Sequence, residues 1–150
     1  MVPGVPRKFM LVAGDPSGDQ LGAELVAELR SQAPGSEFFG AGGPHLAAAG
    51  VDLWCDLTRH AVIGLIEALQ KYRDLRRIFR ALLAEAVRRQ PEVVIGIDYG
   101  AFNLRLAQAL RTTAQGASGW RPRIVSSCRC RFGRRVPAVL RCWPGITICC

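Results

Sequence analysis

The sequence predicts an α/β fold, with a Rossmann-like parallel sheet covered by helices on both faces. Two short apolar runs, Phe9–Ala13 and Val93–Ile97, each end at a turn that contains glycine and aspartate. Segments with apolar residues at helical spacing follow both turns. This alternation of strand, loop and helix is typical of βαβ units, whose right-handed crossovers place the strands in parallel.

The first half of the chain contains five predicted elements. Phe9–Ala13 is a continuous apolar run, as expected for a strand buried on both faces. Leu21–Arg30 has apolar residues at helical spacing and follows a turn whose acidic residues suit a helix amino terminus. Glu37–Phe39 predicts a short strand. His45–Ala49 predicts a helical turn, and the alternation in Val51–Trp54 predicts a third strand.

The second half continues the same pattern. Gly64–Arg89 predicts a long helix with one apolar side, which Pro91 terminates. Val93–Ile97 predicts another buried strand, and Phe102–Arg111 predicts a helix whose leucines are candidate core residues.

Three polar or glycine-rich loops follow the predicted strands: Gly14–Asp19, Gly40–Pro44 and Asp98–Asn103. In open parallel sheets, ligands bind beyond the carboxyl ends of the strands. We therefore expect these loops to meet at one edge of the sheet and to form a ligand site. The pattern by itself indicates no reaction.

The loop Gly14–Asp19 has two interpretations. It could hold a polar ligand against backbone N–H groups at a helix amino terminus, or it could be a tight, capped strand-to-helix turn. It lacks the Gly-Lys-Ser/Thr of a phosphate-binding P-loop, and its glycines are spaced too widely for the dinucleotide-binding fingerprint. The spacing leaves both interpretations open.

Asp98 directly follows a predicted buried strand, where a carboxylate often acts as a base or holds a ligand. It could equally cap the helix that begins near Phe102. Asn103 could orient Asp98, although a capping role for Asn103 is favoured. His45 and His60 have no partner at metal-ligand spacing, and the cysteine pairs do not match zinc spacing, so neither a metal nor a cofactor is predicted.

The charges and cysteines divide the chain near Gly116. Residues 117–150 contain seven arginines, no acidic residue and five of the six cysteines, whereas residues 1–116 have a net charge of +1. We therefore expect an α/β domain over 1–116 and a tail over 117–150 that is non-native or disordered. No apolar run approaches the roughly 18 residues that span a bilayer, and no signal-peptide pattern is present, so a cytoplasmic location is expected.

Four segments together resemble the lipid-A-disaccharide synthase family in order and spacing. They are Val12–Ala23, Phe39–Pro44, Val62–Leu69 and Ile95–Leu106, and the resemblance covers residues 8 to about 112.

The resemblance implies the amino-terminal, acceptor-side part of a two-domain GT-B glycosyltransferase. Such an enzyme joins UDP-diacylglucosamine to diacylglucosamine 1-phosphate, giving the lipid A disaccharide 1-phosphate and UDP, at the cytoplasmic face of the inner membrane. It implies no nucleic-acid partner. By carry-over, Asp98 is the catalytic carboxylate. The implied substrate-binding residues are Gly14, Asp15, Ser17, Gly18, Asp19 and Asn103. The implied membrane contacts are Leu65, Ile66, Leu69, Tyr72, Arg73 and Arg76. These residues lie on a basic amphipathic helix, which can lie on anionic lipid. The alternative is that this helix packs on the sheet with its basic face in solvent.

The sequence departs from the family at three places. Asp15 replaces a usual glutamate, Gly100-Ala101 replaces a usual Pro-Asp, and everything after about Val125 differs. Back-translation of the tail fits a family-like Val-Ser-x-Ser-Val-Trp-Ala in another frame, which suggests a one-base frameshift near Val125. The strand Val93–Ile97 would then keep an unpaired edge. The chain would be inactive alone, because the donor-binding domain would be missing. The alternative is a stand-alone α/β module that binds a small ligand, and an arginine-rich nucleic-acid binder is disfavoured.

Overall fold

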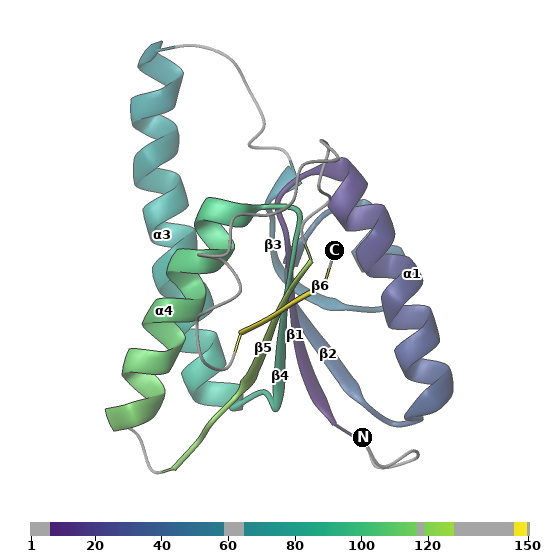
Figure 1. Ribbon diagram of the computed structural model, residues 1–150. Coiled ribbons are helices and arrows are strands. Elements are labelled where there is room, and N and C mark those ends of the chain that lie inside the picture. Colours follow the sequence, from purple (N-terminus) through teal and green to yellow (C-terminus); the bar gives the residue numbers. More distant parts are fainter. Residues whose placement is uncertain (1–6, 59–64, 117–118, 128–145, 150) are drawn as a thin grey trace.

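The computed structural model describes residues 7–58, 65–116, 119–127 and 146–149 (Figure 1). The strands are β1 (Lys8–Ala13), β2 (Glu37–Gly42), β3 (Asp52–Asp56), β4 (Val93–Ile97), β5 (Arg123–Ser127) and β6 (Ile146–Cys149). The helices are α1 (Pro16–Gln32), α2 (Pro44–Ala48), α3 (Leu65–Arg89) and α4 (Gly100–Gly116).

The six strands form one parallel sheet in the order β3-β2-β1-β4-β5-β6. Helices α1 and α2 cover one face, and α3 and α4 cover the other (Figure 1). The chain order reverses between β1 and β4, so this pair is the switch point of a doubly wound sheet. The predicted fold class is confirmed.

The strand β1 shows why its sequence is apolar throughout. Met10 and Val12 enter the core between the sheet and α3 and α4, whereas Phe9 and Leu11 enter the core beneath α1 and α2. All four side chains are buried, because alternate residues of a central strand face opposite helical layers.

Two helices begin earlier than the sequence predicted. Helix α1 starts at Pro16 rather than Leu21, since Asp15 caps it and proline fits the first helical turn. Helix α4 starts at Gly100 rather than Phe102. Both loops at the switch point are consequently shorter than expected.

The expected unpaired edge of β4 is wrong. Strand β5 pairs with β4 in parallel, from Val93↔Arg123 to Ile97↔Ser127, and β6 pairs with β5. Ile124 and Val125 are β-branched residues that suit a strand, and Ile124 is buried in the core. The non-native or disordered character of 117–150 stays a prediction, because residues 128–145 lie outside those described.

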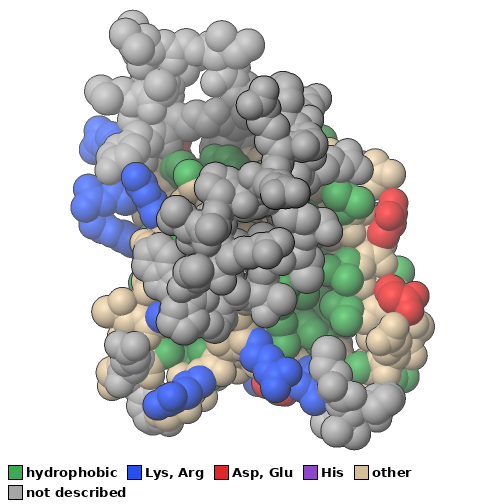
Figure 2. All heavy atoms as spheres, in the orientation of Figure 1, with side chains coloured by type: hydrophobic (Ala, Val, Ile, Leu, Met, Phe, Trp, Pro, Cys, Tyr) green, Lys and Arg blue, Asp and Glu red, His purple; other side chains and the backbone are tan. Residues whose placement is uncertain are grey.

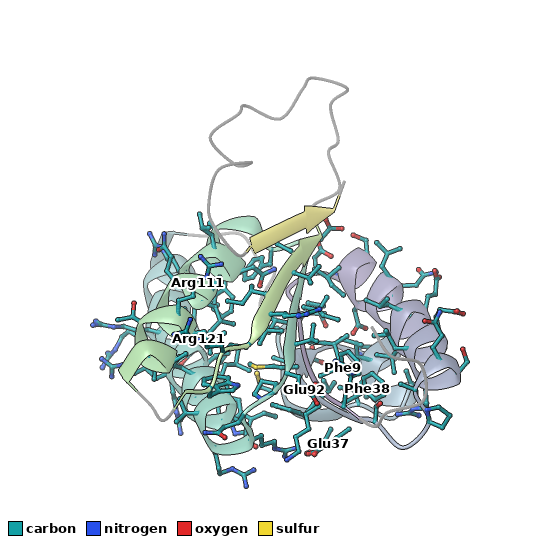
Figure 3. All side chains as sticks on the ribbon, turned by 60° about the horizontal axis from the view of Figure 1, so that its bottom comes forward. Phe9, Glu37, Phe38, Glu92, Arg111 and Arg121 are labelled. Carbon is teal, nitrogen blue, oxygen red and sulfur yellow. The ribbon has the colours of Figure 1, made fainter. Side chains whose placement is uncertain are left out.

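The amino edge of the sheet is closed by side chains (Figure 3). Phe9 and Phe38 stack with ring centroids 5.1 Å apart, and Arg7 forms an ion pair of 3.1 Å with Glu92. These contacts join β1, β2 and β4 at the end opposite the predicted ligand site. The carboxyl edge therefore remains the candidate functional edge.

Candidate functional site

The loops after β1 and β4 touch at the switch point, as predicted. A Cβ added to Gly18 would lie 3.3 Å from the Cβ of Asp98 and 3.0 Å from Oδ1 of Asp15. Glycine at position 18 therefore lets the amino end of α1 lie directly against the residue that follows β4. The structure brings Asp15, Gly18 and Asp98 together at one edge.

Two further glycines are contacted by side chains from the loop after β4 and from the first turn of α4. A Cβ on Gly14 would lie 2.4 Å from Cγ of Tyr99, and one on Gly96 would lie 2.6 Å from Cγ of Asn103. Each glycine is thus a site of close approach, where a methyl group would collide with the neighbouring residue. Tyr99 thus packs against the end of β1, and Asn103 of α4 packs against β4, on either side of the turn that carries Asp98.

Asp15 is the amino-terminal cap of α1. Its Oδ1 accepts a hydrogen bond from the backbone N–H of Gly18 (2.6 Å) and another from the hydroxyl of Ser17 (3.1 Å). The capping interpretation of Gly14–Asp19 is therefore confirmed for Asp15. Ser17 is exposed beside it, and its predicted substrate-binding role stays a prediction.

Asp19 is completely buried and caps a different helix from its own. Its carboxylate accepts hydrogen bonds from the backbone N–H groups of Gly43 (2.7 Å), His45 (2.8 Å) and Leu46 (3.2 Å) at the start of α2. Helix α2 has no side-chain cap of its own, because glycine occupies its cap position. Asp19 thus joins the loops after β1 and β2 and shapes the site edge.

Asp98 is half-buried and has a left-handed backbone conformation, with φ of +46°. Aspartate tolerates this region better than most residues, and such conformations cluster at functional sites. Asp98 thus forms a tight turn between β4 and α4, and this turn places Asp98 at the switch point. Its catalytic role stays a prediction.

Asn103 lies beneath α4, against Gly96, and its side chain is 6% exposed. Its backbone N–H donates to the carbonyl of Tyr99 (2.9 Å) within the first turn of α4. In the described part of the chain, neither Nδ2 nor Oδ1 has a hydrogen-bond partner. The helix-cap interpretation of Asn103 is therefore wrong, because α4 begins at Gly100 and Asn103 lies inside it.

A pocket of about 450 Å³ opens between α3 and the amino end of α4. It is lined by Leu75, Arg76, Phe79, Tyr99, Gly100, Ala101, Phe102 and Arg105. We call it the α3–α4 pocket. The sequence did not indicate it, since its walls come from two helices whose relative placement depends on the sheet between them. Tyr99, the residue that follows Asp98 in the chain, is part of the pocket lining.

The predicted membrane contacts lie on the first half of α3, whose amino end rises beyond the carboxyl edge of the sheet (Figure 1). Arg73 and Arg76 are exposed there, and arginine and lysine side chains gather on this side of the molecule (Figure 2). The side chains of Leu65, Ile66, Leu69 and Tyr72 lie outside the described residues, as does His60. No helix in the described ranges has the length and apolar character needed to cross a membrane.

A doubly wound parallel sheet with polar loops meeting at its switch point defines a Rossmann-type α/β domain. Residues 9–117 match the lipid-A-disaccharide synthetase family, and the chain belongs to that family. The resemblance predicted over residues 8 to about 112 is thereby confirmed.

Individual relatives agree with this assignment. The chain is 43% identical over 106 residues to the lipid-A-disaccharide synthase of Myxococcus xanthus, covering 71% of this chain and 28% of the relative. It is 45% identical over 101 residues to lipid-A-disaccharide synthase 1 of Legionella pneumophila (67% and 26%). It is 38% identical over 102 residues to the synthase of Coxiella burnetii (68% and 27%). The matches thus cover about a quarter of each relative.

Proposed function

We propose that this chain forms the acceptor side of a GT-B glycosyltransferase that makes lipid A disaccharide 1-phosphate. The acceptor is diacylglucosamine 1-phosphate, and the donor is UDP-diacylglucosamine. The observation that carries the proposal is the position of Asp98, at the switch point of a sheet that matches the synthetase family over residues 9–117.

Asp98 acts as the general base in this proposal. The acceptor hydroxyl oxygen attacks the anomeric carbon of the donor, the bond between that carbon and UDP breaks, and the hydroxyl proton passes to the Asp98 carboxylate. The other two acids of this edge have structural work, since Asp15 caps α1 and Asp19 caps α2. The loop after β4 offers no second acid, because Gly100 and Ala101 follow Tyr99. Asp98 is the base in this proposal because it directly follows β4 at the switch point.

Helix α3 is the surface that contacts the cytoplasmic face of the inner membrane in this proposal. Arg73, Arg76, Arg77 and Arg80 are all exposed, and none forms an ion pair with an acidic residue within the ranges described. Each basic residue near an anionic lipid surface contributes about 1 kcal/mol to binding. Such a helix holds the protein peripherally and brings the site edge close to lipid substrates.

A chimaera tests the proposed function. Residues 8–112 replace the corresponding segment of the Myxococcus xanthus synthase, and UDP release is measured with both lipid substrates. We expect activity from the chimaera, and Asp98→Asn should lower kcat by at least about 100-fold, as expected for loss of a general base. Asp74→Asn, on the exposed surface of α3, is the matched control and should leave kcat unchanged.

Two results would contradict the proposal. One is a chimaera that folds, as judged by circular dichroism, and releases no UDP. The other is an Asp98→Asn chimaera that remains as active as the Asp74→Asn control.

A further inference from the structure

The α3–α4 pocket combines an aromatic wall with an open mouth. The Phe79 and Phe102 rings meet edge to face with centroids 5.6 Å apart, and Tyr99 lies against Phe102 at 5.3 Å. Leu75 completes the apolar lining. At about 450 Å³, the pocket lies within the range of roughly 300–1,000 Å³ that is usual for small-molecule sites. The pocket is large enough for an apolar group, and its apolar walls favour such a group over water.

Each of the two helices that form the α3–α4 pocket contributes one arginine to its lining. Arg76 comes from α3 and Arg105 from α4, and both are exposed while lining the pocket. Among the described residues, neither guanidinium forms an ion pair or a hydrogen bond with an acidic side chain. Gly100 and Ala101, the first residues of α4, also line the pocket, and the amino end of a helix favours an anion.

We propose that the α3–α4 pocket binds one molecule of a phosphate-bearing amphiphile. Its hydrocarbon chain lies among Leu75, Phe79 and Phe102, and its phosphate lies between Arg76 and Arg105. Arginine suits this role, because its planar guanidinium binds phosphate through paired hydrogen bonds. An uncharged amphiphile would leave both arginines without a partner, and free phosphate would leave the aromatic wall uncovered.

This assignment rests on the proposed function for the identity of the natural ligand as a lipid phosphate. It adds the residues that select the phosphate group, and it places that group beside the loop carrying Asp98. The occupant is a single lipid molecule rather than a bilayer surface. The two proposals can fail separately, because binding to the pocket requires no sugar transfer.

Calorimetric titration of the full chain with decyl phosphate, kept below its micelle-forming concentration, tests the proposal. Decyl maltoside and inorganic phosphate are the comparison probes. We expect decyl phosphate to bind at least tenfold more tightly than either. Arg76→Ala and Arg105→Ala should each weaken this binding by roughly fivefold, as for loss of one partly exposed ion pair. The affinity should also fall as salt is added.

Two matched variants control for the loss of net charge. Arg80→Ala lies one turn beyond Arg76 on α3, and Arg111→Ala lies on α4 beyond Arg105; neither residue lines the pocket (Figure 3 shows Arg111). Both should bind decyl phosphate within twofold of the unaltered chain. A third variant, Ala101→Trp, places a large side chain at the exposed mouth of the pocket and should weaken binding at least tenfold.

Three outcomes would overturn the inference. Equal affinity for decyl maltoside would show a purely apolar site. Equal losses in Arg76→Ala and Arg80→Ala would show attraction to the general charge of α3, as at a membrane surface. Unchanged binding in Ala101→Trp would place the ligand elsewhere. If decyl phosphate fails to bind while the chimaera transfers sugar, only the pocket assignment falls; if it binds to an inactive chimaera, only the proposed function falls.

Discussion

The ring of Tyr99 lies directly on Gly14, so closely that a Cβ at position 14 would come within 2.4 Å of the Tyr99 Cγ. Gly14 directly follows β1, and Tyr99 follows Asp98 after β4. The contact therefore spans the switch point and couples the position of the predicted base to the end of the neighbouring strand.

Gly14→Ala should disturb both stability and activity. The added methyl group forces the Tyr99 ring away, and overpacking of this kind costs about 1–3 kcal/mol. We expect urea denaturation to show a loss of about 2 kcal/mol, and the chimaera to lose activity because Asp98 moves with Tyr99. In a Tyr99→Ala background the same substitution should cost much less. Equal costs in the two backgrounds would mean that the ring is not what the methyl group meets.

Asp19→Asn should separate α2 from α1. The carboxylate accepts three backbone hydrogen bonds, and an asparagine amide would direct an N–H donor at a backbone donor of Gly43 or His45. Losing buried hydrogen bonds to a charged acceptor costs about 1.5–3 kcal/mol each. We expect the free energy of unfolding to fall by about 3 kcal/mol in urea denaturation. Asp15→Asn, at the half-buried cap of α1, should cost at most about 1 kcal/mol.

The strands and the site edge could be predicted because their signals are local. The continuous apolar runs of β1 and β4 indicate burial on both faces, and the glycine-rich loops at their ends indicate the switch point. Helix α1 starts five residues before the predicted Leu21, because proline suits a first helical turn as well as a loop.

Other features depend on distant partners and could not be predicted. Asp19 was expected to stabilise the helix dipole of α1, yet its partners lie 24 to 27 residues away at the start of α2. The frameshift expected near Val125 implies an unpaired edge of β4, yet β5 pairs with β4 up to Ser127. Ile124 and Val125, the two β-branched residues of β5, suit this strand.

Asn103→Leu should stabilise the fold while impairing the site. Within the described residues, the buried amide of Asn103 has no hydrogen-bond partner. The free-energy cost of removing this amide from water on folding is therefore not offset by a hydrogen bond. Leucine has the same branching at Cγ and removes this cost, and we expect the free energy of unfolding to rise by about 1 kcal/mol in urea. The chimaera should lose activity if Asn103 is retained for substrate binding. A loss of stability in Asn103→Leu would instead indicate that the amide is satisfied in the folded protein.

Glu85 should make the stability of this chain sensitive to acid. Hydrogen bonds from Arg88 and Arg89 lower the pKa of the Glu85 carboxyl from 4.5 to about 2. A carboxyl whose pKa is lowered by folding stabilises the folded state above its unfolded pKa. Its contribution is therefore complete above about pH 4.5 and is lost as the pH falls towards 2. Because the group lies near the surface, the contribution should be about 1 kcal/mol or less.

Urea denaturation of Glu85→Gln at a series of pH values measures this contribution. The variant should be less stable than the unaltered chain at pH 7, and the difference should shrink through the window between 4.5 and 2. Glu24→Gln, an exposed residue of α1, is the control that removes one negative charge without removing an arginine partner. A difference that stays constant across this window would contradict the argument, since the two chains differ there only in whether residue 85 can take up a proton. A difference that shrinks equally in the Glu24→Gln control would point instead to the net charge of the whole chain.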